Sequence, residues 1–243
     1  MFQSAVSPMR NVHMQVAERI GTSIIRGEIL PGSPLPSELR ICEMLDVSRT
    51  VVREAIRMLT GKGLVESRPK SGTRVRPPET WNQFDPDVLR WQLGTADVDA
   101  YLAKLFSLRH AVEPTASALA ATGATAEDQA AIRTACEAMA TATNNEDFVA
   151  ADIAFHKAIY LGTRNEFFWP IAQMFEISLR QSFTIAATGN HRPRALAEHR
   201  TLMEAILARD PIAAREATIV LLGHSAGDLV RIRGTDPFAG KSV

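Results

Sequence analysis

The chain has 243 residues, of which 46% are hydrophobic and 22% charged, as in an ordinary globular protein with room for two domains. No apolar stretch reaches the ~18 residues that span a bilayer, and the first ten residues lack the apolar core of a signal peptide. We therefore expect a cytoplasmic protein with no membrane partner. Cys42 and Cys136 lie far apart, which favours reduced thiols over a disulfide framework.

The net charge of zero conceals an uneven distribution along the chain. Residues 1–78 carry 12 lysines and arginines against seven acidic residues, whereas residues 79–243 carry 15 against 20. A basic head on an acidic body indicates that only the head meets a polyanion. Chance scatter of charges is the alternative explanation for a difference of this size.

The head is predicted to contain three helices followed by a β-hairpin. Ser37 and Ser48 each stand where a hydroxyl can cap the first amide groups of a helix. The hairpin is indicated by two alternating segments on either side of a turn that contains proline and glycine. The expected helices span 9–27, 37–45 and 48–60, and the expected strands span 64–67 and 73–76.

After a predicted linker and connecting helix over 79–96, the sequence shows helical periods and no strand pattern. The expected helices span 85–94, 97–123, 126–143, 145–162, 165–187, 193–209 and 211–231. The predicted fold is therefore mainly α, with an N-terminal winged helix-turn-helix that has a two-stranded β wing, and a C-terminal all-α bundle. The predicted domains are 1–78, the linker region 79–96, the bundle 97–233, and a flexible tail over 234–243.

The third predicted helix carries the pattern expected of a DNA reader. It begins with Ser48, Arg49, Thr50 and Arg53, while its apolar residues form an inner face. Hydroxyls and backbone amides at a helix N-terminus hold phosphates, and arginine binds guanine through two hydrogen bonds in the major groove. A solvated surface helix is the simpler interpretation of the two arginines alone, but it does not explain the capped helix and hairpin around them.

The turn of the predicted hairpin supplies a second basic surface. A basic wing tip can lie along or in the minor groove of DNA. The candidate wing residues are Arg68, Lys70, Gly72 and Thr73.

Residues 35–38 (Leu-Pro-Ser-Glu), 45–55, 63–65 and 72–75 together resemble the GntR family of bacterial regulators over about residues 10–76. The resemblance implies that Arg49 and Arg53 contact bases, while Ser48, Thr50 and the wing help to hold the DNA backbone. The family often has arginine directly after the Ser-Glu pair, where this chain has Leu39. The contact from the second helix, which begins at Ser37, is therefore either lost or made by Arg40.

Four polar residues lie on apolar faces of three predicted helices in the bundle. Asp152 and His156 stand one helical turn apart, a spacing that lets a carboxylate and an imidazole bind one ion. His199 and His224 occupy similar positions on two later helices. The pattern favours a metal site, although each histidine taken alone is more commonly a hydrogen-bonded packing residue.

Arg109 lies close to the apolar face of the helix predicted over 97–123. A guanidinium that turns inward needs an anionic partner, because an unpaired buried charge is costly. A bound anion would satisfy this need. Glu113, four residues on in the same helix, would satisfy it equally well, and spacing alone does not decide between them.

Residues 108–114, 151–156, 198–200 and His224 follow the order and spacing of the FCD effector-binding domain, which defines the FadR-type branch of the GntR family. The resemblance covers about residues 97–231 and implies an antiparallel bundle with a central cavity. It further implies a divalent metal, often zinc, on Asp152, His156, His199 and His224. The carboxylate of a small organic acid would then bind Arg109.

Residues 81–91 are similar to the linker region of sugar-acid-responsive members, such as repressors of galactonate catabolism. A helix that packs the head onto the bundle is the alternative interpretation of this segment.

Together these features predict a transcriptional regulator, in the simplest case a repressor. It would bind palindromic double-stranded operator DNA as a homodimer and respond to a small carboxylate, such as a sugar acid. Zinc is the expected metal, and nickel or manganese also suits one aspartate and three histidines. One alternative is a metal-dependent hydrolase with an accessory head, but no HExxH-like motif supplies its general base. Another is a regulator whose metal is purely structural.

Overall fold

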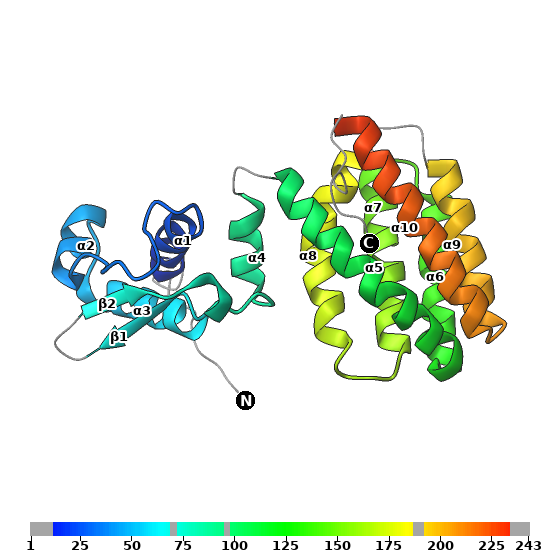
Figure 1. The fold of residues 1–243 in the computed structure, drawn as a ribbon, viewed down its shortest axis with the longest axis horizontal. Coiled ribbons are helices and arrows are strands. Elements are labelled where there is room, and N and C mark those ends of the chain that lie inside the picture. The colour runs from blue at the N-terminus through cyan, green and yellow to red at the C-terminus, as the bar shows by residue number, and fades with distance from the viewer. Residues whose placement is uncertain (1–11, 69–71, 95–97, 187–191, 234–243) are drawn as a thin grey trace, which may run out of the picture. The chain divides into compact units, whose positions relative to one another are not determined.

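The computed structural model describes residues 12–68, 72–94, 98–186 and 192–233, so Lys70 and the predicted tail lie outside the described residues. The chain divides into two compact units, Met1–Ala96 and Asp97–Val243 (Figure 1). Within the described residues the chain is mostly helical and has a two-stranded antiparallel sheet. These elements confirm the predicted fold class.

The first unit contains the predicted helices and hairpin in the predicted order. Its core joins buried side chains of the first and third helices, the strands and the fourth helix, among them Ile24, Leu59, Val75 and Trp91. The strands pair in antiparallel register, with Val65 opposite Val75. The elements are α1 (Val12–Ile25), α2 (Glu38–Leu45), α3 (Arg49–Gly61), β1 (Val65–Arg68), β2 (Gly72–Val75), the 3-10 turn η2 (Pro78–Thr80) and α4 (Pro86–Leu93).

Two serine caps set the starts of the helix-turn-helix. Ser37 Oγ accepts a hydrogen bond from the Arg40 amide at 3.2 Å, and Ser48 Oγ accepts one from the Val51 amide at 3.4 Å. Each helix begins one residue after its serine, because an N-cap residue lies outside the helical conformation. Between the helices, Asp46 adopts a left-handed conformation with φ of 52°, which ends α2 and allows the tight turn into α3.

The helix predicted as a connector packs against the head itself. The ring of Trp91 in α4 lies so close to Gly21 in α1 that a Cβ there would stand 2.3 Å from a ring carbon. Lys62 Nζ lies 2.8 Å from Asp85 Oδ1 and 2.7 Å from Asp87 Oδ2, which ties the end of α3 to the start of α4. The glycine therefore permits a close approach that the ion pairs then hold.

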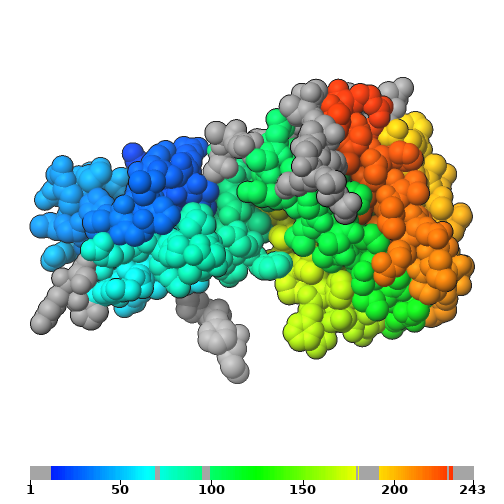
Figure 2. All heavy atoms as spheres, viewed as in Figure 1, coloured from blue at the N-terminus to red at the C-terminus, as the bar shows by residue number. Residues whose placement is uncertain are grey.

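The second unit is a bundle of helices, as Figure 1 shows. The long helix α5 packs against α10 and α7, while α7 also packs against α6 and α8. In the space-filling view, α5 and α10 form a continuous surface on the visible face of this unit (Figure 2). The helices are α5 (Val98–Gly123), α6 (Ala126–Thr141), α7 (Asn145–Gly162), α8 (Trp169–Ala186), α9 (Arg192–Leu207) and α10 (Pro211–Arg233).

Side-chain caps set the starts of two of the bundle helices. Thr125 and Asp128 form a reciprocal capping box at the start of α6, and Asn144 caps α7. The helix predicted to begin at residue 165 begins at Trp169 instead. Arg164 has a φ of 53° and the Asn165 side chain accepts from the Phe167 amide, so these residues form a turn.

Among the described helices, each is either too short or too polar to cross a membrane.

Candidate functional site

The two faces of α3 differ in the way that a DNA-reading helix requires. Val52, Ala55 and Leu59 are fully buried against the head. Arg49 and Arg53 lie on the exposed side of the same helix, with Ser48 and Thr50 exposed at its start. The structure thus leaves the predicted base-contacting side of α3 open to solvent.

Two of the candidate arginines on α2 and α3 already have acidic partners. Arg53 Nε donates to Glu38 Oε2 at 2.9 Å, which connects α3 to α2, and Arg40 donates to Glu43 at 3.1 Å. All four side chains are at least 37% exposed, and such ion pairs contribute little stability because water screens them. DNA phosphates or bases can therefore compete for both arginines at small cost. Leu39, at the family's usual arginine position, is 54% exposed.

The wing is anchored to the preceding loop. Arg68 pairs with Glu66 at 2.8 Å, and the hydroxyls of Ser67 and Thr73 lie 2.9 Å apart across the two strands. Gly72 has a φ of 75°, in the region that favours glycine. Arg74 donates to the Gly32 carbonyl at 2.9 Å, so the strand after the tip is tied to the loop that precedes α2.

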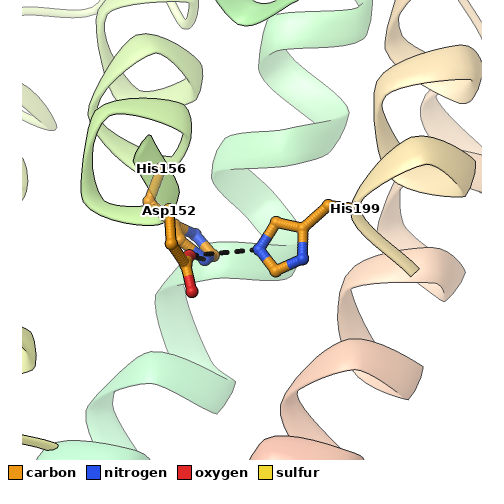
Figure 3. Close-up of side chains that lie close together, drawn as sticks. All are labelled: Asp152, His156 and His199. Atoms are coloured by element: carbon orange, nitrogen blue, oxygen red, sulfur yellow. Dashed lines mark hydrogen bonds and ion pairs between the residues drawn. The ribbon is translucent and has the colours of Figure 1, made fainter. Parts of the chain in front are cut away.

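The bundle brings together three of the four predicted metal ligands. Figure 3 shows Asp152 and His156 reaching from α7 toward His199 on α9. Asp152 Oδ1 lies 3.1 Å from His199 Nε2 and 3.3 Å from His156 Nε2. The three residues are 3–7% exposed, and their candidate ligand atoms all lie within 4.8 Å of one another.

Both imidazoles are held through their other nitrogen. His156 Nδ1 lies 3.2 Å from Glu113 Oε2 on α5, and His199 Nδ1 lies 2.7 Å from the Ala195 carbonyl oxygen one turn earlier on α9. Metal-binding histidines usually donate that second nitrogen to a carboxylate or carbonyl, which fixes the ring and directs the first nitrogen at the ion. The two rings are therefore oriented as ligands, with Nε2 facing Asp152.

The distances between these donors suit one small divalent ion. At bond lengths of about 2.0–2.2 Å, neighbouring ligand atoms lie roughly 2.8–3.1 Å apart on an octahedral ion and roughly 3.3–3.6 Å apart on a tetrahedral ion, a total range of roughly 2.8–3.6 Å. The contacts of Asp152 Oδ1 with the two histidines, 3.1 and 3.3 Å, fall in that range. A carboxylate with two imidazoles is also a donor set that zinc, nickel and manganese accept.

His224, the fourth predicted ligand, does not join this cluster. Its Nδ1 lies 2.5 Å from Glu198 Oε1, and half of its side chain is exposed. Glu198 also lies 3.4 Å from Arg194 Nε, so His224 belongs to a polar network between α9 and α10. Helical spacing placed His224 on the correct helix but could not show the acidic competitor on α9.

Arg109 is fully buried and has the partner that the sequence left as one of two alternatives. Its Nε donates to Glu113 Oε1 at 2.5 Å, and its guanidinium lies over the Phe106 ring at 4.9 Å from the centroid. Since Glu113 also contacts His156, the arginine and the ligand cluster are joined through one carboxylate. Sequence spacing indicated the first contact of Glu113, but its contact with a helix 43 positions further on had no local signal.

Charge pairing outweighs burial in setting the ionisation of this cluster. Burial opposes the charge of Glu113, but Arg109 and His156 lower its pKa from 4.5 to about 2. Burial likewise opposes a charged His156, yet Glu113 and Asp152 raise its pKa from 6.5 to about 9. Burial also opposes the charge of Asp152, and the two histidines nevertheless lower its pKa. The carboxylates and His156 therefore favour one another's charged forms inside the bundle.

Comparison with known proteins identifies two families along the chain. Residues 13–75 match the bacterial regulatory proteins of the gntR family, and residues 104–224 match the FCD domain. An uncharacterized HTH-type transcriptional regulator of Escherichia coli K12, YieP, is 34% identical over 220 residues, which cover 89% of this chain and 95% of YieP. The galactonate operon transcriptional repressor of the same strain is 34% identical over 220 residues, covering 88% and 94%.

A solved structure shares the fold over most of the chain. It is the structure of Lar, a protein that controls the expression of the Listeria monocytogenes agr system. It has a TM-score of 0.62 with 18% identity, and the match covers 94% of this chain and 99% of Lar.

Proposed function

The chain belongs to the GntR family of DNA-binding transcriptional regulators, in the group that carries an FCD domain, and we propose that it is a repressor controlled by a small organic acid. The two families are those of regulators and not of enzymes, so the hydrolase alternative has no support from the relatives. The observation that carries the proposal is the convergence of Asp152, His156 and His199 inside a bundle that shares its chain with a DNA-binding head.

For the head, we propose that α3 lies in the major groove, with Arg49 and Arg53 at base edges and the wing along the backbone. The exposure of both arginines opposite a buried apolar face supports this placement. A homodimer would read two half-sites about 34 Å apart, which corresponds to a palindromic operator. Because the proposed operator is double-stranded DNA inside the cell, we propose a cytoplasmic location.

For the bundle, we propose that Asp152, His156 and His199 hold a divalent ion, most simply zinc. When bound, the ion supplies a Lewis acid that accepts carboxylate or hydroxyl oxygens. Arg109 binds the carboxylate of the effector. The relative named for the galactonate operon supports a sugar acid as the ligand class. A change in the bundle on binding would then alter how the dimer presents its heads to the operator.

An electrophoretic mobility shift with DNA from the protein's own promoter region tests the proposal. The zinc-loaded protein should shift this DNA and not a scrambled duplex, and one member of a sugar-acid panel should release it. The same panel applied to an Arg109→Ala variant should leave the DNA bound. Absence of sequence-specific binding would refute the regulator's proposed operator, and a normal response of the variant would refute the role of Arg109.

Zinc titration of single variants tests the ligand set. His156→Ala and His199→Ala should each weaken zinc binding by at least tenfold, because each removes a donor from the cluster. His224→Ala should weaken zinc binding to the same extent only if His224 leaves Glu198 and binds the ion. Equal zinc affinity of the wild type and His156→Ala would exclude this metal centre.

A purely structural metal remains the second candidate, and it predicts that effector binding survives metal removal. The effector identified in the sugar-acid panel is titrated into chelator-treated protein. This titration distinguishes a metal that binds the effector from a metal that is purely structural. Circular dichroism must first show that the stripped protein is still helical. Unchanged affinity under those conditions would assign the effector to a different pocket.

A further inference from the structure

A buried carboxylate lies between Arg109 and the ligand cluster. Glu113 accepts from Arg109 Nε at 2.5 Å through Oε1, and its Oε2 lies 3.2 Å from His156 Nδ1. The side chains of Arg109, Glu113 and His156 are 0%, 2% and 6% exposed. Any anion that reaches Arg109 therefore encounters a carboxylate that already binds the guanidinium.

With both histidines counted as neutral, the net charge of this cluster changes from negative to positive when a divalent ion binds. Without the ion, Asp152 and Glu113 contribute two negative charges and Arg109 one positive charge, which leaves a net charge of −1. A divalent ion between Asp152 and neutral histidines brings the total to +1. Because uncompensated charge is costly away from water, only the metal-loaded cluster favours an additional anion.

We propose that Glu113 is the positioning residue that makes anion binding at Arg109 conditional on the metal. This inference rests on the proposed metal centre. With Glu113 in place, the positive charge of Arg109 is already neutralised, so the charge that attracts the effector comes from the ion. A single carboxylate balances the loaded cluster, and the ligand class is therefore a monocarboxylate.

Substitution Glu113→Gln tests this role, because it removes one negative charge while keeping the shape and an oxygen acceptor for Arg109. The probes are Zn²⁺ alone and acetate as the simplest monocarboxylate. In the wild type, acetate should raise the thermal unfolding midpoint only when zinc is bound. In the variant, metal-free protein should bind acetate at least about tenfold more tightly than metal-free wild type.

The same substitution should weaken zinc binding roughly 10–100-fold, measured by isothermal titration, because His156 loses its orienting carboxylate and the ion loses a nearby negative charge. Zinc and acetate affinities thus change in opposite directions. General damage to the bundle would weaken both. Glu113→Asp keeps the charge and should keep the requirement for metal.

Glu176→Gln is the matched control. Glu176 lies in the same unit and pairs with Lys157 at 3.0 Å, and the two side chains are 35% and 48% exposed, unlike the buried ligand cluster. This variant should bind zinc and acetate as the wild type does. Chloride at equal ionic strength controls for screening by salt.

Wild-type protein alone can overturn the inference, even if Glu113→Gln does not fold. Equal stabilisation by acetate with and without zinc would show that the metal does not control the anion site. Failure of acetate to stabilise the zinc-loaded protein would remove the anion site itself. Failure of zinc to bind, or unchanged binding in His156→Ala, would instead refute the metal centre of the proposed function.

Discussion

The contacts of the candidate site residues depend on acidic partners on other helices as well as on position along their own helix. Arg109, Asp152 and His156 form a buried chain of contacts because Glu113 reaches from α5 to α7. Arg53 is held by Glu38 on the neighbouring helix of the head. In both places an acidic residue pairs with the arginine to which we assign a ligand, so the proposed binding would compete with an existing ion pair.

At the residue scale, Arg49→Ala should cost about 1–3 kcal/mol of operator binding and relax the sequence preference, because it removes a proposed base contact. Fluorescence anisotropy with operator and scrambled duplexes measures both effects. Arg57→Ala is the control, since Arg57 is exposed on the same helix and paired with Glu54 at 2.9 Å. It should weaken the two duplexes equally if it has any effect. Retained discrimination by Arg49→Ala would contradict the assignment.

At the element scale, α4 behaves as a part of the head because it packs on α1 and is tied to α3. The contact of Trp91 with Gly21 is apolar, whereas Lys62 with Asp85 and Asp87 is a partly buried charge cluster. The stability of the head should therefore depend both on the packing of Trp91 against Gly21 and on the pH that sets the charges of the Lys62 cluster. Each contact can be tested separately.

Gly21→Ala should destabilise the head by roughly 1–3 kcal/mol, because the added methyl would lie 2.3 Å from the Trp91 ring. Gly61→Ala is the matched control. Gly61 is helical and has nothing within 4 Å of a built Cβ, so alanine there should be neutral or stabilise by about 0.5–1 kcal/mol. Urea unfolding followed by tryptophan fluorescence gives both values. Equal effects at the two glycines would show that α4 does not pack closely on α1.

The Lys62 cluster should make the stability of the head fall in acid. Burial opposes a charged Asp87, but Lys62 outweighs it and lowers its pKa below 3.8. The stabilisation is thus present above the ordinary aspartate value and is lost as pH falls through the lowered pKa. Lys62→Met should reduce stability by roughly 1–3 kcal/mol at pH 7. That deficit should shrink as pH falls below 3.8, as measured by urea unfolding. A deficit independent of pH would contradict the pairing.

At the scale of the whole molecule, the candidate DNA-binding residues and the candidate metal ligands lie in different units. The candidate ligands all lie in Asp97–Val243, and the exposed arginines of α3 lie in Met1–Ala96. Ligand binding can therefore stabilise one unit without touching the other directly.

Zinc should stabilise the second unit selectively. At 100 times its dissociation constant, zinc adds about 2.7 kcal/mol to the unit that binds it. Hydrogen exchange measured by mass spectrometry should show slower exchange in α7 and α9 on zinc addition, reversed by a chelator, and no change in α3. Protection that appeared in α3 alone would be incompatible with a metal centre in the bundle.

The sequence by itself determined the features that depend on neighbours along the chain. Helical and strand periods, the caps at Ser37 and Ser48, and the motifs around Arg49 and Asp152 were sufficient for the fold class and the family. The start of α8 was predicted four residues too early, because Arg164 and Asn165 form a turn that apolar periodicity does not indicate.

Only the tertiary structure decided which of the candidate site residues meet. It joined His199 to Asp152, gave Glu113 a second contact on His156, turned His224 to Glu198, and placed Trp91 on Gly21. A helical period fixes which face of each helix is apolar. The rotation and offset between two packed helices depend on side chains far apart in the sequence, so the contacts across their interface cannot be read from either helix alone.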